Sequence, residues 1–278
     1  MNPFRLFRRR RDKVVTFILG CHRSGTTMLE KVLGRPDEVS LYGEGNRKAM
    51  RVKEFYRFRE DAGIRKLIAR DPKRFIVFKP INDSQHADRL LELYPGAKAV
   101  WIYRSYGDTI NSMIRKWGGN QRRIIDWIRD HGDHLEGDGL NEWDGDNWES
   151  IFAERISSES LSLIRGLGSD ALSQEDAAGL VWYLRNQVYF DRDLPSDPRA
   201  LLVRYEELVT SPEEELKRIF EFVGLDGHEE YVPEIVASSV GKESPPVLVP
   251  EVEELCRGML EQLDVAREGA MVGPPGKG

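Results

Sequence analysis

The sequence predicts an α/β fold, a three-layer sandwich in which helices cover both faces of a mainly parallel central sheet. Two observations carry this prediction. Several apolar runs are nearly continuous instead of alternating, which is typical of strands buried on both faces. Helical patterns lie between these runs, as in doubly wound sheets. The runs are VVTFILG (14–20), RFIVFKP (74–80), KAVWIYR (98–104) and RALLVRY (199–205), with VSLYG (39–43) as a shorter candidate.

Helical patterns follow three of these strands. The first helix is expected to begin near Gly25 and to end before Gly34, and the second follows the 98–104 strand. In both helices apolar side chains recur at the spacing that puts them on one face. They are Met28, Leu29, Val32 and Leu33 in the first helix and Tyr106, Ile110, Met113, Ile114 and Trp117 in the second.

The third helix follows the 199–205 strand in the segment SPEEELKRIFEFVGL. Ser211 is expected to be its N-cap, Pro212 its first residue, and Glu214 the second member of a capping box. Gly224 is expected to end the helix. Its buried face would consist of Leu216, Ile219, Phe220 and Val223.

Residues 118–172 interrupt the alternation of strands and helices. The stretch DHLEGDGLNEWDGDNWE is acidic and glycine-rich, and its spacing does not fit an EF-hand. We predict a long loop here, followed by helices near 151–166 and 173–191. The expected organisation is a basic leader (1–13), one domain (14–268) with an inserted loop and helical region (about 118–192), and a disordered tail (269–278).

Composition narrows the classes of function. The 278 residues include 41 basic and 47 acidic side chains, for a net charge of −6. Such a chain does not attract nucleic acid in bulk, so any anion site must be a local basic cluster. No run approaches the ~20 apolar residues of a membrane span, and Arg8–Arg11 is expected to be solvated, with a weak membrane-surface role left open. The two cysteines, Cys21 and Cys256, argue against a disulfide framework and fit a reducing compartment, the cytoplasm.

The segment LGCHRSGTT (19–27) has the two glycines of a phosphate-binding P-loop, Gly20 and Gly25, but Thr26 stands where a Walker loop has lysine. A helix that begins near Gly25 aims backbone N–H groups at a bound anion. Thr26 and Thr27 add hydroxyl donors, and Arg23 adds a planar fork suited to a phosphate or sulfonate. The loop therefore predicts a phosphate-type site that lacks the lysine for β- and γ-phosphates.

A second cluster, YRSYGDTINSM, begins as the 98–104 strand ends. Arg104 stands at the carboxyl end of that strand, where open α/β sheets bind their ligands. Ser112 follows on the next helix. An anion held by Arg104 and Ser112 would lie near the first loop if the two strands are neighbours in the sheet.

These segments together resemble the sulfotransferase family. GCHRSGTT resembles the family's loop for the 5′-phosphosulfate of 3′-phosphoadenosine 5′-phosphosulfate (PAPS). AVWIYRSYGDTINSM resembles its 3′-phosphate element, in which Arg104 and Ser112 have the required spacing of eight. LLVRYEELVTSPEEELKRIFEFVGL resembles its late strand and the helix that follows. The resemblance is clear over roughly 14–46, 74–113 and 200–225.

The resemblance implies a P-loop nucleotide-kinase-like fold, PAPS as donor without a metal ion, and transfer of a sulfonate to a hydroxyl or amine. It implies that Tyr205 lies near the adenine and that Lys242 belongs to a late basic loop on the 3′-phosphate. His22 could also be proposed as a base, although local packing suits it better. The expected donor-binding residues are His22, Arg23, Ser24, Gly25, Thr26, Thr27, Arg104, Ser112, Tyr205 and Lys242.

Two further residues acquire catalytic roles through the resemblance. Glu44, in EVSLYGEGNR, occupies the place of the base in tyrosylprotein-type sulfotransferases, although Gly45 replaces a second glutamate there. A carboxylate beside the acceptor oxygen can remove its proton. Lys79 ends the FIVFKP run, where related enzymes carry a lysine. Its ammonium would stabilise the charge on the leaving phosphate.

Two other functions remain open at this point. A P-loop small-molecule kinase would need a loop lysine and carboxylates for Mg²⁺, and a non-catalytic nucleotide-binding protein of the same fold would need neither Glu44 nor Lys79. The acceptor is expected to be a small molecule, a glycan or a peptide. Trp143 and Trp148 could stack on sugar faces or belong to the core, and the oligomeric state is left open.

Overall fold

The computed structural model describes residues 12–59, 62–132, 148–168, 172–235 and 241–272. Its centre is a five-stranded sheet in the order β2-β5-β1-β6-β7, and every neighbouring pair in it is parallel. The sheet confirms the predicted strands, with slightly different ends. The strands are β1 (Val14–Gly20), β2 (Val39–Tyr42), β5 (Phe75–Phe78), β6 (Lys98–Tyr103) and β7 (Ala200–Arg204).

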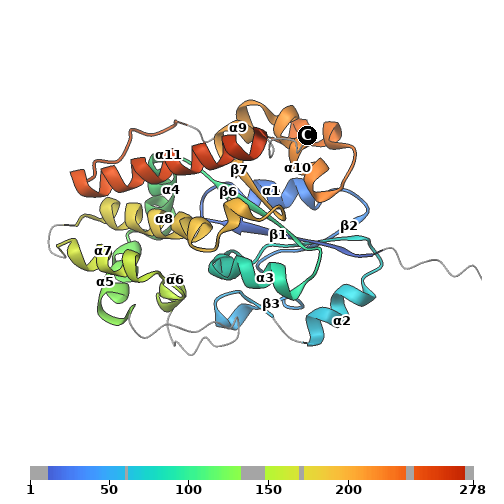
Figure 1. Cartoon of the computed structure of the whole chain (residues 1–278), viewed down its shortest axis with the longest axis horizontal. Helices are drawn as coiled ribbons and strands as arrows, with labels where there is room; N and C mark the ends of the chain where they lie inside the picture. Colours follow the sequence, from blue (N-terminus) through green and yellow to red (C-terminus); the bar gives the residue numbers. More distant parts are fainter. Residues whose placement is uncertain (1–11, 60–61, 133–147, 169–171, 236–240, 273–278) are drawn as a thin grey trace, which may run out of the picture.

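Each face of the sheet contributes side chains to a separate hydrophobic cluster. Side chains alternate along each strand, so Ile18 and Ile102 join one cluster while Leu19 and Trp101 join the other. The first cluster is closed by α1 (Thr26–Leu33), α9 (Tyr205–Thr210) and α10 (Pro212–Val223). Figure 1 shows α1 and α10 on one side of the sheet and α3 and α8 on the other, which confirms the three-layer sandwich.

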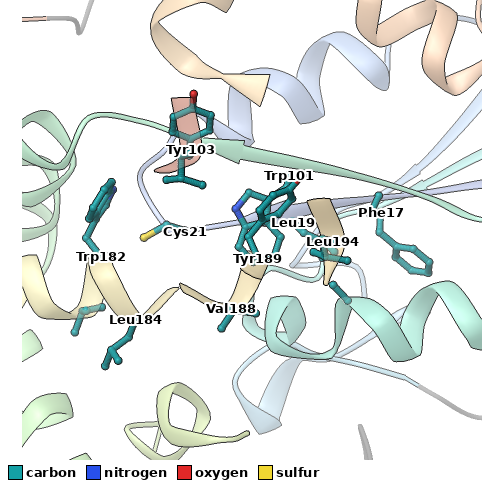
Figure 2. Packing of buried hydrophobic residues seen from close by; sticks show 14 of the residues in the cluster. Phe17, Leu19, Cys21, Trp101, Tyr103, Trp182, Leu184, Val188, Tyr189 and Leu194 are labelled. Carbon is teal, nitrogen blue, oxygen red and sulfur yellow. The ribbon is translucent and has the colours of Figure 1, made fainter. Parts of the chain in front are cut away.

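The second cluster lies under α3 (Ala87–Leu93), α4 (Tyr106–Trp117), α8 (Gln174–Asp191) and α11 (Pro250–Val272). Figure 2 shows aromatic side chains of α8 packed against β1 and β6. Trp101 and Tyr189, for example, have ring centroids 5.6 Å apart. The long helix α8 thus packs against the central strands β1 and β6 and forms part of the second layer.

Smaller elements complete the fold. An antiparallel ribbon pairs β3 (Met50–Arg51) with β4 (Arg57–Phe58). The remaining α-helices are α2 (Ala62–Arg70), α5 (Gln121–His131), α6 (Ser150–Ala153) and α7 (Ser158–Gly166). The 3-10 turns are η1 (Val52–Glu54), η2 (Ile81–His86), η4 (Leu194–Ser196) and η5 (His228–Glu234).

Several predicted details are corrected. The region expected to be a long loop contains α5, and the helix expected near 151–166 is divided into α6 and α7. Tyr205 begins α9 and does not end a strand. Ser211 precedes α10 with Pro212 as its first residue, but the Ser211 side chain makes no capping hydrogen bond, so the capping box is absent there.

The C-terminal region also differs from the prediction. The helix α11 was not predicted, and it continues to Val272, into the segment expected to be a disordered tail. Residues 1–11 of the expected leader lie outside the described residues. Among the helices that the structure describes, none is long and apolar enough to cross a membrane.

Both cysteines are buried and unpaired. Burial raises the pKa of the Cys21 thiol, which directly follows β1, to about 12. Burial also raises the pKa of Cys256, which lies on the inner face of α11 and donates to the carbonyl of Gly179 on α8 (3.5 Å). Both side chains behave as small core residues, since their reactive thiolate forms are disfavoured.

Candidate active site

The loop between β1 and α1 depends on two glycines with positive φ. Gly20 (φ 132°) lies so close to β6 that a Cβ would be 2.3 Å from the carbonyl oxygen of Ile102. At Gly25 (φ 95°), which caps α1, a Cβ would be 2.2 Å from Cδ2 of Tyr205. The loop therefore packs tightly on β6 and Tyr205, and α1 begins directly after it, so that the first N–H groups of the helix lie at the loop.

The predicted neighbourhood of the two anion elements is confirmed. Because β1 and β6 are adjacent, with Gly20 opposite Ile102, the segments that follow them begin side by side. Arg23, at φ 68°, donates from Nε to Oγ of Ser112 on α4 (3.0 Å). This hydrogen bond joins the loop directly to the Arg104–Ser112 element.

Arg104 is almost completely buried at the end of β6. Its guanidinium pairs with Asp108 (3.0 Å) and lies over the ring of Tyr205, with Cζ 4.7 Å from the ring centroid. The Tyr205 ring therefore packs on both Arg104 and Gly25, and only 3% of this residue is exposed. This arrangement makes Tyr205 a support of the loop, a role that the sequence did not predict.

The segment that carries Lys242 lies along α4. The N–H of Gly241 donates to Oδ2 of Asp108 (3.2 Å), and Asn111 donates to the carbonyl of Ser244 (3.0 Å). Lys242 itself is exposed. Because Asp108 also pairs with Arg104, this segment lies beside the buried arginine.

Lys79 joins the loop to the segment after β2. Its Nζ donates to Oγ1 of Thr27 (3.1 Å) and to Oε2 of Glu30 (2.8 Å), and it lies 3.2 Å from Oε2 of Glu44. The side chain of Lys79 is 4% exposed, whereas that of Glu44 is 32% exposed. The two predicted catalytic residues thus form an ion pair, and Glu44 is its more accessible member.

His22 is packed among aromatic rings. Its ring centroid lies 5.8 Å from that of Trp117 and 5.8 Å from that of Phe152. Burial, together with the positive charge of Arg185, lowers the pKa of His22 to about 3. An imidazole with so low a pKa is a weak proton acceptor, so the site gives His22 a packing role, as the sequence favoured.

A cavity of about 350 Å³ opens beside the Glu44–Lys79 pair. Its polar end is formed by the loop and by this ion pair, and its other walls are largely aromatic and aliphatic. Ser24, which is fully buried, and Arg104 are not among the lining residues. The lining residues are His22, Arg23, Thr26, Thr27, Glu44, Phe55, Tyr56, Lys79, Ile81, Asn82, Met113, Lys116, Trp117, Gln121, Ile124, Trp148, Phe152 and Val181.

The sequence missed most of the apolar wall. Phe55 and Tyr56 lie in the β3–β4 turn, both at positive φ, and Asn82 donates to the carbonyl of Phe55 (2.5 Å). Trp148 does line the cavity and packs on Phe152 (5.1 Å), whereas Trp143 lies outside the described residues. These residues come from separate segments with no shared motif, so no local signal identified them.

A buried polar network supports the cavity floor. Arg57 of β4 donates to Asp83 (2.6 Å) and to Glu154 (2.6 Å), and Glu154 also contacts His86 (3.0 Å). Burial by itself would raise the pKa of Glu154, but the hydrogen bond with His86 and the charge of Arg57 outweigh it and lower that pKa to about 2. The network ties β4, η2 and the residue after α6 into one unit.

A second arginine joins this unit to α8. Arg185, which is fully enclosed, donates to the side chain of Gln85 (2.9 Å) and to the carbonyl of Ile81 (2.6 Å). Ser84, in the same turn, accepts from the N–H of Gly20 (3.1 Å). The turn η2 therefore fixes both the cavity floor and the end of β1.

The fold and site define an α/β protein with a glycine-containing loop between β1 and α1, a second basic element beside it, and a carboxylate–lysine pair facing a cavity. The family comparison is more specific: residues 13–243 match the sulfotransferase domain, and the chain belongs to this family. The protein is therefore a sulfotransferase, an enzyme that transfers sulfuryl groups.

Solved structures agree with the fold. The chain is similar to the sulfotransferase domain of the olefin synthase from Synechococcus PCC 7002, at 14% identity and a TM-score of 0.53, over 90% of this chain and 95% of that one. It is also similar to the sulfotransferase domain from the curacin biosynthetic pathway, at 15% identity and a TM-score of 0.50, over 90% and 98% of the two chains. No curated protein sequence matches the chain. The predicted P-loop nucleotide-kinase-like fold is confirmed.

Proposed function

We propose that the enzyme transfers a sulfonate from PAPS to a hydroxyl group of a small-molecule acceptor, with Glu44 as the base and Lys79 on the leaving phosphate. The observation that carries this proposal is the position of Lys79. It donates to Thr27 in the loop (3.1 Å) and lies 3.2 Å from Glu44. One ammonium therefore connects the phosphate-binding loop to the carboxylate at the mouth of the cavity.

The donor set fits PAPS in its chemistry. The tight Gly25 turn leaves the N–H groups at the start of α1 for a 5′-phosphosulfate. Arg104 and Ser112, with Lys242 nearby, offer a cation and hydroxyl for a 3′-phosphate. Arg23 bridges the two parts through its hydrogen bond to Ser112. In this proposal Ser24 holds the turn of the loop, through the hydrogen bond from its N–H to the carbonyl of Cys21 (3.4 Å), and Tyr205 supports the loop.

The proposed reaction is an in-line displacement. PAPS supplies a sulfonate attached to a phosphate leaving group. Glu44 takes the proton of the acceptor hydroxyl while the new O–S bond forms. Lys79 and the N–H groups of α1 stabilise the negative charge that collects on the phosphate while the old S–O bond breaks. The products are a sulfate ester, 3′-phosphoadenosine 5′-phosphate (PAP) and a proton on Glu44.

The cavity favours an acceptor with a flat, apolar body. Trp117, Trp148 and Phe152 supply aromatic surface, and apolar contact of this kind binds planar rings. The region 118–192 contributes five of the lining residues and is proposed to be the acceptor region. These are Gln121, Ile124, Trp148, Phe152 and Val181.

A transfer assay tests this function. The enzyme would be incubated with PAPS or ATP and with four acceptors: a phenol, an aliphatic alcohol, an amino sugar and a tyrosine peptide. We expect mass spectrometry to detect the gain of one SO₃ with PAPS, first on the phenol. Transfer of phosphate from ATP would instead support the hypothesis of a small-molecule kinase. Binding of PAP without transfer to any acceptor would support the hypothesis of a non-catalytic nucleotide-binding protein.

A further inference from the structure

Glu30 lies at the junction of three parts of the site, although no motif marks it. It lies on α1 one turn after Thr27, and its Oε2 accepts from Nζ of Lys79 at 2.8 Å. Its other carboxylate oxygen rests against the backbone before Glu44, because a Cβ on Gly43 would be only 2.1 Å from Oε1. The Glu30 carboxylate is therefore wedged between Lys79 and Gly43, and 18% of its side chain is exposed.

The ammonium of Lys79 is fully engaged by the protein. It has three N–H donors, and it faces three oxygens: those of Thr27, Glu30 and Glu44. A phosphate at the loop can receive a hydrogen bond from Lys79 only if one of these contacts is given up. The contact with Glu44 is the longest, at 3.2 Å, and the Glu44 side chain is more exposed than that of Glu30, at 32% against 18%.

We propose that Glu30 is the positioning residue of the reaction: it retains Lys79 beside the loop when the donor arrives, so that Lys79 exchanges Glu44 for the donor phosphate. This inference rests on the proposed function. The exchange has two effects. Lys79 gains the leaving phosphate, and Glu44 is released from its ion pair to face the acceptor.

The negative charge of Glu30 makes the inference testable by the direction in which PAP affinity changes when that charge is removed. A carboxylate near a bound phosphate repels it, so simple electrostatics predicts that removal of this charge tightens the binding of PAP. Positioning predicts the opposite. Without Glu30, the ammonium keeps Glu44 as its carboxylate partner, and PAP loses a charge-assisted hydrogen bond. The direction of the change therefore separates the two accounts.

The test is a double-mutant cycle with PAP as the probe. Affinity would be measured by calorimetry at fixed salt for wild type, Glu30→Gln, Lys79→Met and the double variant. We expect Glu30→Gln to weaken PAP binding about 3- to 30-fold when Lys79 is present. In the Lys79→Met background the same change should leave PAP affinity unchanged or improve it. Glu221→Gln, an exposed carboxylate on α10, is the matched control and should have no effect.

The outcomes are distinguishable. If Glu30→Gln binds PAP as tightly as wild type or more tightly, Glu30 does not position Lys79. Equal weakening in both Lys79 backgrounds would show that Glu30 acts through the structure of α1 instead. A wild-type enzyme that binds PAP but sulfates no acceptor would overturn the proposed function and leave the cycle readable. Failure of wild type to bind PAP would overturn both.

Discussion

At the scale of single residues, the proposed role of Glu44 as the base rests on its surroundings. It follows Gly43, lies at the mouth of the cavity, and pairs with a lysine that also reaches the loop. Glutamine has almost the same shape but cannot accept the proton. We predict that Glu44→Gln lowers turnover by ~10²–10⁴, the usual contribution of a general base, and changes PAP affinity by no more than a few-fold.

The comparison for this variant is His22→Ala. Because the His22 ring has a pKa of about 3 and packs on Trp117 and Phe152, its loss should affect turnover much less. Turnover with the best acceptor and calorimetry with PAP would be measured together. Near-normal turnover in Glu44→Gln would exclude it as the base, and loss of both PAP binding and thermal stability would show a structural role.

Arg104 carries the second residue-level prediction. Its guanidinium is buried between Asp108 and Tyr205, so it is held in place before a phosphate arrives. Removal of a charge-assisted hydrogen bond costs about 1.5–3 kcal/mol. We therefore expect Arg104→Ala to weaken PAP binding roughly 10- to 150-fold. Arg257→Ala, on the exposed face of α11, is the control. Unchanged affinity in Arg104→Ala would refute the 3′-phosphate assignment.

At the scale of elements, the turn between β1 and α1 has no room for a larger side chain at Gly25. Gly25 has φ 95°, and a Cβ there would meet the ring of Tyr205, over which Arg104 also lies. We predict that Gly25→Ala destabilises the fold by about 2–4 kcal/mol, through backbone strain and steric overlap. Urea unfolding gives the measurement.

A second glycine with positive φ separates the cost of steric overlap from the cost of backbone strain. Gly96 also has positive φ, at 80°, but nothing lies within 4 Å of a Cβ built there. Gly96→Ala should therefore cost only about 1 kcal/mol, the penalty for a left-handed backbone. Equal costs at Gly25 and Gly96 would mean that the contact with Tyr205 is relieved easily.

The elements also show which parts of the molecule the sequence can predict. The loop and the Arg104–Ser112 element were predictable because each is a local motif beside a buried strand. The helix α11 carries a comparable signal: Val252, Cys256 and Met259 recur at helical spacing and are buried. The stripe formed by Ile124, Ile125 and Ile128 in α5 is a signal of the same kind, so spacing alone is enough to predict both helices.

The cavity could not be predicted in the same way. Phe55, Trp117 and Phe152 are far apart in the chain and meet because β4 and α6 pack on η2, while α4 and η2 both pack on α8. The proposed role of Glu30 could not be predicted from the sequence for a related reason. Its helical position is ordinary, and its importance comes from Lys79, which belongs to another strand end.

At the scale of the whole molecule, the Arg57–Glu154 network links the ribbon, η2 and α6 to the core. The pKa of Glu154 falls from 4.5 to about 2 on folding. Its contribution to stability is therefore fully present above about pH 4.5 and is lost as the pH falls toward 2. We predict that Glu154→Gln destabilises the protein by about 3 kcal/mol at neutral pH, since it removes one of the two carboxylates that compensate the buried charge of Arg57 and leaves only Asp83.

The acid range provides the check. The difference in unfolding free energy between wild type and Glu154→Gln should shrink as the pH falls from 4.5 to 2, because wild-type Glu154 is then protonated too. Urea unfolding at several pH values measures it. A difference that stays constant across this range would place the effect in packing and not in charge.

The two buried thiols can report local unfolding, because each reacts only when the structure around it opens. Cys21 follows the central strand β1, whereas Cys256 lies under the last helix, α11. An alkylating reagent can reach either sulfur only after the structure around it opens. We predict that Cys256 is modified faster than Cys21 at low denaturant, because α11 can detach alone while β1 is exposed only when the whole sheet separates. Peptide mass spectrometry over time would give both rates, and equal rates at every denaturant concentration would mean that α11 and the sheet unfold as one unit.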